Sequence, residues 1–374
     1  MPGPETETTP PSAPAIPAAG RPLATLFITS YNQEAYVGAA IDGAFAQTYA
    51  PLEIVMSDDA SADRTFEIMR EKAAAYRGPH RIVLNRNEKN LGIVPHVEKV
   101  MSLASGEIIV ENAGDDVSVP HRVETMVAAW LASGRRAKVI HTARRRMDEA
   151  GRLHEVFDDR RVLAHQTPLE VIRDHGTMVG ASLAWDRDVY DIFGPQSPIA
   201  IFDDFPTCFR AALIGEIHYL PEPLLNYRTG GTSAQPTDRA GWNHLHGFRV
   251  KDLRWHRSFW LRYLADMEIV EPPDAAECRR LCREKIARAD FVIGLAEARR
   301  ARLPLRLPGS LWRTLRTGDA FWLGETLKYL AGPLYERRLD AKTAARAARD
   351  VTRDVPGTGG PAETPADAPA GAGP

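Results

Sequence analysis

The regular alternation of short apolar runs with amphipathic segments is the feature that most constrains the fold of this chain. Between Leu23 and Thr142, strand-like runs (LATLFI, LEIVM, RIVLN, EIIVE and KVIHT) are separated by segments with helical spacing. Repeated strand, helix, strand units imply a mostly parallel sheet covered by helices on both faces. The sequence therefore predicts an α/β domain with Rossmann-like organisation.

Polar segments follow the first four predicted strands, namely TSYNQE, SDDAS, NRNEKNLG and NAGDD. In an open parallel sheet, ligands bind outside the carboxyl ends of the strands. We therefore expect the functional site at this edge. Ser61, in SDDAS, is also a plausible N-cap for the helix that follows.

Composition excludes several classes of protein. The 374 residues are 44% hydrophobic and 26% charged, with a formal net charge of -2 and a pI near 6.6. This balance is typical of a soluble globular protein and gives no global signal for nucleic-acid binding. The three cysteines form no CxxC pair, no apolar run reaches about 20 residues, and the N-terminus lacks the order of a signal peptide. We expect a cytoplasmic protein.

Changes in composition suggest the domain boundaries. Residues 1–20 and 351–374 are rich in Pro, Ala, Gly and Thr, which predicts disordered tails. The α/β pattern and the polar motifs occupy residues 21–236. Residues 237–350 are helical in pattern and rich in arginine, so we expect a separate C-terminal helical region.

The sequence lacks the motifs of two common phosphate-binding loops. The turn after the first strand has neither GxGxxG nor GxxxxGK[ST], and Thr29 and Ser30 stand where a haloacid-type phosphatase would carry its nucleophilic aspartate. What remains is a site with carboxylates at two strand ends. One carboxylate can accept hydrogen bonds from a base or sugar, and another can hold a divalent cation that neutralises a diphosphate.

An ordered set of motifs resembles family 2 glycosyltransferases of the GT-A fold. The set is ITSYNQEAYVGAAIDGAFAQTYAPLEIVMSDDASADRTFEI, NEKNLGI, AGDDVSVP, IFDDFPTCFRAALIG and PEPLLNYRTGGTS, and it covers roughly residues 22–233. The resemblance implies an inverting hexosyltransferase that uses a nucleotide-diphosphate sugar, assisted by Mg²⁺ or Mn²⁺. It also implies a role in assembling a surface polysaccharide or glycolipid.

The metal-binding motif of the family matches Asp115, with Asp116 adjacent. Ala113 stands where the commonest DxD pattern has its first aspartate, so fewer protein oxygens would reach the metal, with water and diphosphate supplying more. The alternative is a solvated turn in which an aspartate caps the next helix.

The resemblance also assigns residues to the nucleotide sugar. Asp58 would accept the imide N–H of uracil or thymine, so a UDP- or dTDP-sugar is the expected donor, and Asp59 would hold the loop or the ribose. The alternative is that both are helix-start charges favoured by the macrodipole. The remaining residues expected near the nucleotide are Thr29, Tyr31, Glu34, Asn90 and Gly92.

The acceptor side matches IFDDFPTCFRAALIG. Asp204 aligns with the family's general base and Asp203 with its acidic neighbour, although an aspartate at a helix start is also an ordinary N-cap. Arg228 would pair with a phosphate. Gly230 and Gly231 replace a histidine that many relatives carry. The expected acceptor is a hydroxyl group, with a lipid-linked glycan among the candidates.

The stretch from Arg299 to Arg316 holds six arginines and no acidic residue, followed by FWLGETLKYLAGPLY. This pattern suits a helix lying on an anionic membrane, as in a peripheral protein on the inner face. A solvated helical face and a subunit contact remain alternatives. For the whole chain, the rival functions are a sugar nucleotidyltransferase and an inactive nucleotide-sugar-binding homologue.

Overall fold

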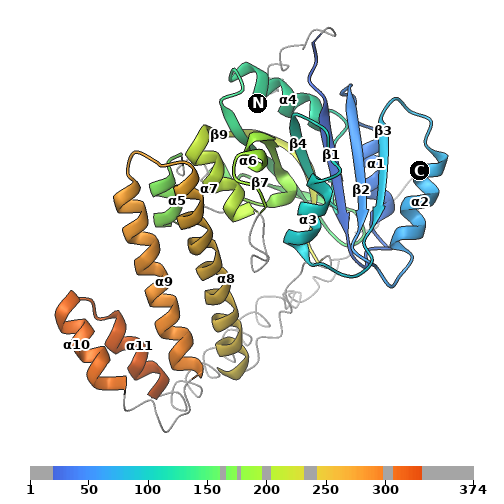
Figure 1. Cartoon of the computed structure of the whole chain (residues 1–374). Coiled ribbons are helices and arrows are strands. Elements are labelled where there is room, and N and C mark those ends of the chain that lie inside the picture. Colours follow the sequence, from blue (N-terminus) through green and yellow to red (C-terminus); the bar gives the residue numbers. More distant parts are fainter. Residues whose placement is uncertain are drawn as a thin grey trace, which may run out of the picture. The chain divides into compact units, whose positions relative to one another are not determined.

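The computed structural model describes residues 20–160, 166–174, 178–195, 204–230, 242–297 and 306–330. The chain divides into two compact units: residues 1–237 with 249–297, and residues 238–248 with 298–374. The first unit contains the sheet. In the second unit, two short helices are described, α10 and α11 (Figure 1).

One sheet organises the first unit, with strand order β3-β2-β1-β4-β8-β6-β9-β5 and β7 paired to β6 (Figure 1). Its strands are β1 Ala24–Ser30, β2 Leu52–Asp58, β3 Arg81–Arg86, β4 Ile108–Ala113, β5 Val117–Ser118, β6 Ala137–Met147, β7 Leu153–Phe157, β8 Leu183–Asp186 and β9 Glu216–Arg228.

The strands β3, β2, β1 and β4 form the parallel half that the alternating pattern predicts. The inner strands β1 and β2 are buried almost throughout, because helices cover both faces of the sheet. The predicted Rossmann-like α/β organisation is confirmed. The other half is mixed: β8 runs antiparallel between β4 and β6, while β6 and β9 are parallel neighbours.

The helices of the first unit pack against the two faces of the sheet. Residues from α1, α2 and α4 form one hydrophobic core with one face, and residues from α3, α5, α7, α8 and α9 form the other. The bounds are α1 Val37–Phe45, α2 Thr65–Ala75, α3 Ile93–Met101, α4 Arg122–Ala132, α5 Pro168–Asp174, α6 Asp188–Asp191, α7 Asp204–Ile214, α8 Trp242–Ile269 and α9 Ala275–Glu297. From Arg249 onward, α8 and α9 belong to the same compact unit as the sheet.

Helix α7 is fastened to α8 by a buried ion pair and by stacked aromatic rings. The Nε of Arg210 lies 3.1 Å from Oδ2 of Asp266, and both side chains are almost fully buried. The rings of Phe209 and Tyr263 stack with their centroids 4.0 Å apart. These contacts fix α7, whose first residue is Asp204.

The start of α2 differs from the prediction in one detail. Ser61 does not cap the helix; its hydroxyl instead donates to Asp58, and accepts from the backbone N–H of Asn32. Asp63, which precedes the N-cap residue Arg64, accepts through Oδ1 from the N–H of Thr65 at 3.0 Å. The polar turn thus uses Ser61 to fix the end of β2.

In the second unit, α10 Leu307–Thr317 and α11 Phe321–Leu330 form a helical hairpin. Gly318 ends α10 with a φ of +68°, and its N–H donates to the carbonyl of Thr314 at 2.8 Å. Among the helices in the described ranges, none is both long enough and apolar enough to span a bilayer.

Candidate active site

The carboxyl ends of the parallel strands are joined by backbone hydrogen bonds. The N–H of Asp59 donates to the carbonyl of Ser30 at 2.9 Å, and the N–H of Gly114 donates to that of Thr29 at 2.9 Å. The N–H of Asn87 donates to the carbonyl of Asp58 at 2.8 Å. The polar segments after β1, β2, β3 and β4 therefore start from a single rigid edge, as the sequence predicts.

Buried polar side chains fix the loop that carries Asp115 and Asp116. Nδ2 of Asn112 donates to the carbonyl of Asp116 at 3.0 Å. Arg122 is fully buried and donates to Oδ1 of Asn112 at 3.1 Å and to the carbonyl of Glu111 at 2.8 Å. Buried charged hydrogen bonds of this kind give a loop a defined shape.

Gly114 has a steric role in the same loop. A Cβ at this position would lie 1.9 Å from Oγ of Ser30 and 2.4 Å from Oε1 of Gln33. Any side chain would push the loop away from β1. The glycine lets the two aspartates that follow lie directly against the turn after β1.

Arg228, at the end of β9, connects this loop to two distant parts of the unit. Its backbone N–H donates to Oδ1 of Asp116 at 2.7 Å, and its Nε donates to the carbonyl of Asp115 at 3.0 Å. Its Nη1 donates to the carbonyls of Asp148 and Glu149, at 2.7 and 3.0 Å. The guanidinium also lies 4.4 Å from the centre of the Tyr36 ring. Through these contacts, the buried side chain of Arg228 joins the loop of Asp115 and Asp116 to the segment of Asp148 and Glu149.

Burial dominates the electrostatics of the two aspartates. It raises the pKa of Asp115, while a backbone hydrogen bond, the charge of Arg228 and a hydrogen bond from Gln33 lower it. Burial and the charge of Asp115 raise the pKa of Asp116 well above its usual range. A bound cation would favour the ionised carboxylates and oppose this shift. Within the described ranges, however, no three His, Cys, Asp or Glu side chains cluster as a metal site.

Asp58 and Asp59, after β2, are both buried and both hydrogen-bonded within the protein. Asp58 accepts from the N–H of Ser61 at 3.0 Å and lies 3.4 Å from Nε of Arg86. Asp59 accepts from the backbone N–H groups of Leu91 and Gly92 at 2.9 and 3.0 Å. It therefore holds the loop between β3 and α3 against the end of β2.

The other residues expected near the nucleotide lie on the same edge with different exposures. Thr29 is half-buried at the end of β1, and Tyr31 is 44% exposed. Glu34 is exposed and accepts from the N–H of Arg64 at 3.0 Å. Asn90 is exposed and accepts from the N–H of Gly92, whose φ is +81°. The edge thus combines a rigid base with exposed side chains above it.

Asp204 begins α7, and Asp203 lies outside the described residues. The Tyr227 phenol lies within electrostatic range of both sides of the site. Burial raises its pKa, as do the charges of Asp116, Asp115 and Asp204, while Arg144 lowers it. The charges of Asp204, at the start of α7, and of Asp115 and Asp116 thus all act on the Tyr227 phenol.

Three residues of this network were not anticipated from the sequence: Gln33, Tyr36 and Arg122. Gln33 and Tyr36 sit in the polar turn after β1, where nothing distinguishes them from neighbouring polar residues. Arg122 did leave a signal. It lies on the apolar stripe of α4 with Val123, Met126 and Trp130, and a charge on such a stripe must find buried partners.

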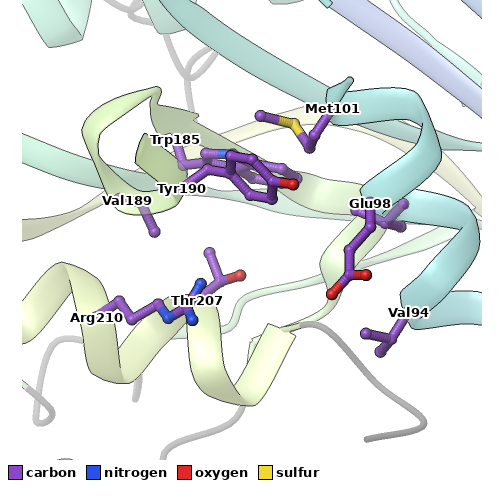
Figure 2. Close-up of a pocket in the computed structure, with 9 residues that line it drawn as sticks. Val94, Glu98, Met101, Trp185, Val189, Tyr190, Thr207 and Arg210 are labelled. Carbon is purple, nitrogen blue, oxygen red and sulfur yellow. The ribbon is translucent and has the colours of Figure 1, made fainter. Parts of the chain in front are cut away.

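A small cavity lies in the core, lined by α3, by α7 and by the segment from β8 to α6 (Figure 2). Its walls include Glu98, Trp185, Tyr190 and Arg210, and its volume of about 20 Å³ has room for a water molecule but none for a sugar. None of the predicted site residues lines it. The strand-end edge remains the candidate site.

The mixed, mostly parallel sheet with helices on both faces is a GT-A-type α/β fold, and the hydrogen-bonded pair Asp115 and Asp116 lies at its strand-end edge. Residues 25–187 match the family described as Glycosyl transferase family 2. This segment of the chain therefore resembles that glycosyltransferase family.

Similar proteins include the putative glycosyltransferase EpsE of Bacillus subtilis (strain 168), 30% identical over 168 residues. That match covers 44% of this chain and 58% of EpsE. Chondroitin synthase of Escherichia coli is 30% identical over 132 residues, which are 35% of this chain and 18% of that protein. The structure of S. aureus TarS 1-349 in complex with UDP-GlcNAc superposes with a TM-score of 0.52 and 14% identity, covering 82% of this chain and 81% of that 1–349 chain. This last likeness is one of fold.

Proposed function

We propose that the protein transfers a hexosyl group from a nucleoside-diphosphate sugar to a hydroxyl acceptor, with inversion at the anomeric carbon. The observation that carries the proposal is the hydrogen-bonded connection from Arg228 to Asp115 and Asp116, beside the rigid ends of β1 and β2. Such a preorganised acidic loop suits a reaction in which charge develops on a diphosphate leaving group.

The donor is proposed to lie over the strand-end edge, with its nucleoside near the turn of Asp58 and Asp59. Three features support this: the rigid base of the edge, the exposed ring of Tyr31, and the loop that Asp59 holds at Gly92. The TarS domain, which shares the fold, binds UDP-GlcNAc. We propose a UDP- or dTDP-sugar, with Asp58 sharing its carboxylate between Ser61 and the base imide.

Asp115 is the residue proposed to hold a divalent cation, Mg²⁺ or Mn²⁺. One carboxylate fits such an ion when diphosphate oxygens and water complete the shell. Burial raises the pKa of Asp115, and a bound cation would favour its ionised form. When bound, the ion would neutralise charge on the departing diphosphate. Asp116 is less accessible, because it is 1% exposed and accepts from Arg228.

On the acceptor side, Asp204 is proposed as general base, with Asp203 as its neighbour. The acceptor oxygen forms a bond to the anomeric carbon as the bond from that carbon to the phosphate oxygen breaks. Asp204 takes the hydroxyl proton, and the electron pair of the broken bond leaves with the nucleoside diphosphate. A single displacement of this kind inverts the anomeric configuration.

The acceptor class is proposed from relatives. The chondroitin synthase match supports a growing glycan, so a surface polysaccharide or glycolipid precursor is the expected product. A soluble or peripheral enzyme at the cytoplasmic face would meet such an acceptor.

The donor proposal is tested by nucleotide-dependent stabilisation. With Mn²⁺ present, UDP or dTDP should raise the melting temperature, because ligand binding to the folded state stabilises it. At a hundredfold excess of nucleotide over Kd, the free energy of unfolding should rise by about 2.7 kcal/mol. The Asp58→Asn variant should respond weakly, while Asp191→Asn, an exposed control in the first unit, should respond as the wild type does. Stronger stabilisation by GDP would remove Asp58 from the proposed role.

A further inference from the structure

Two side-chain hydrogen bonds and one cation–π contact join α10 to α11. Oγ of Ser310 lies 2.6 Å from Oγ1 of Thr326, and Oγ1 of Thr314 accepts from the N–H of Leu323 at 3.2 Å. The guanidinium of Arg313 lies 4.9 Å from the centre of the Trp322 ring. Residues 310, 313 and 314 therefore mark the face of α10 that meets α11.

The opposite face of α10 is apolar and exposed. Leu315 follows Leu311 by four residues and Trp312 by three, so the three side chains share one side of the helix. Their exposed fractions are 47%, 57% and 76%. On a helix packed to exclude water these side chains would point inward, where Ser310 and Thr314 point instead. The outward placement marks a surface built to meet an apolar partner.

The charged residues of α10 and of its N-cap, Arg306, Arg313 and Arg316, are all positive, and the next charged residue along the chain is Asp319. Arg306 and Arg316 are exposed at the two ends of α10, and Arg316 lies 5.0 Å from the centre of the Trp312 ring. Between Arg299 and Gly318 the sequence has no acidic residue. In α11, Glu325 is 4% exposed and so is withdrawn from the surface. An apolar face flanked by arginines is complementary to a lipid surface with anionic headgroups.

We propose that α10 lies on an anionic bilayer, with Leu311, Trp312 and Leu315 inserted among the lipids and Arg306 and Arg316 at the headgroups. Tryptophan is favoured at this depth because its ring is apolar and its N–H is polar. The arginines add attraction that depends on the charge of the lipid. None of these residues belongs to the candidate active site, and the proposal does not depend on the function proposed there.

The experiment is flotation of the full-length protein with vesicles of phosphatidylcholine alone, or of phosphatidylcholine with phosphatidylglycerol. The wild type should bind the anionic vesicles, and high salt should weaken the binding. Leu315→Glu should lower the partition coefficient by about tenfold, the loss expected when a buried leucine is replaced by a charge. Leu261→Glu, at a leucine 41% exposed on α8, is the matched control and should bind as the wild type does.

Two arginine variants test the contribution of charge to vesicle binding. Arg306→Gln and Arg316→Gln should each weaken binding to anionic vesicles by about fivefold. Arg70→Gln, at an exposed arginine on α2, should not. Equal binding by wild type and Leu315→Glu would overturn the proposal. So would absence of vesicle binding together with a concentration-dependent dimer that Leu315→Glu disrupts, because a second copy would then be the partner.

Discussion

The backbone N–H of Arg228 donates a hydrogen bond to Oδ1 of Asp116 at 2.7 Å, joining residues 112 positions apart in the chain. The same residue reaches the carbonyl of Asp115 through its side chain. The end of β9 is therefore bonded to the loop after β4. Arg228 therefore supports the loop that carries Asp115 and Asp116.

Replacing Arg228 tests this supporting role. Arg228→Lys keeps the backbone bond to Asp116 but loses the side-chain fork to the carbonyls of Asp115, Asp148 and Glu149. We expect a loss of about 2 kcal/mol in the free energy of unfolding, together with weaker nucleotide binding. Urea denaturation and nucleotide titration measure the two effects. Arg152→Lys, at a side chain 79% exposed, is the control, and an equal effect there would refute the assignment.

The buried ion pair between α7 and α8 should support the acceptor side. Asp266→Asn leaves the buried guanidinium of Arg210 without its counter-charge, and we expect a loss of about 3 kcal/mol in unfolding free energy. Asp290→Asn breaks an exposed pair with Arg257 and should cost less than about 1 kcal/mol. Chemical denaturation of both variants compares them directly. Similar stabilities would show that α8 does not hold α7.

The two halves of the sheet differ in how far the sequence predicts them. The half from β3 to β4 follows from local periodicity, because each of its strands is joined to the next one along the chain through one covering helix. The insertion of β8 between β4 and β6 depends on pairing such as Ile109 with Trp185, which no local pattern encodes. The sequence also does not predict that α8 packs against α7 through Asp266, because that aspartate lies in an Arg-rich stretch with many possible partners.

The candidate site shows the same division. Motif positions such as Asp115 and Asp59 were identified from the sequence, and the structure brings their loops to one edge. The partners of those residues were not identified, because they are carbonyls and N–H groups fixed by the backbone fold. Arg228 illustrates the difference: its motif suggested a phosphate contact, while its guanidinium is engaged by the carbonyls of Asp148 and Glu149.

Substitution of Asp204 tests the proposed general base. Asp204→Asn keeps the size of the side chain but cannot accept a proton at neutral pH, so kcat should fall by about 10² to 10⁴. Nucleotide affinity should be retained, which separates this effect from a collapsed fold. Asp203→Asn should lose less. If Asp204→Asn transfers sugar near the wild-type rate and Asp203→Asn does not, the two roles are exchanged.

A buried histidine gives an expected pH dependence of stability. Among the described residues, neither ring nitrogen of His141 has a hydrogen-bond partner, and the Tyr219 ring centre lies 5.7 Å away. Burial lowers the pKa of His141 to about 4, with Asp159 raising it and Arg144 lowering it. The unfolded state therefore binds more protons between about pH 6.5 and pH 4, so stability falls as the pH falls through that range.

His141→Phe should remove this contribution. Between about pH 7 and pH 5, we expect the wild type to lose about 2 kcal/mol more unfolding free energy than the variant. Urea denaturation at each pH measures the difference. Parallel pH profiles for the two proteins would show that His141 does not titrate on unfolding.

Release of nucleoside diphosphate from a panel of nucleotide sugars with Mn²⁺ tests the proposed glycosyl transfer most directly. In this assay, water replaces the acceptor hydroxyl and reacts slowly. We predict release from a UDP- or dTDP-sugar, lost in EDTA and in the Asp115→Ala variant, and unchanged in Asp188→Asn, an exposed control. Nucleotide binding without release from any donor would contradict the account and identify an inactive homologue. Full release in EDTA would contradict the role given to Asp115.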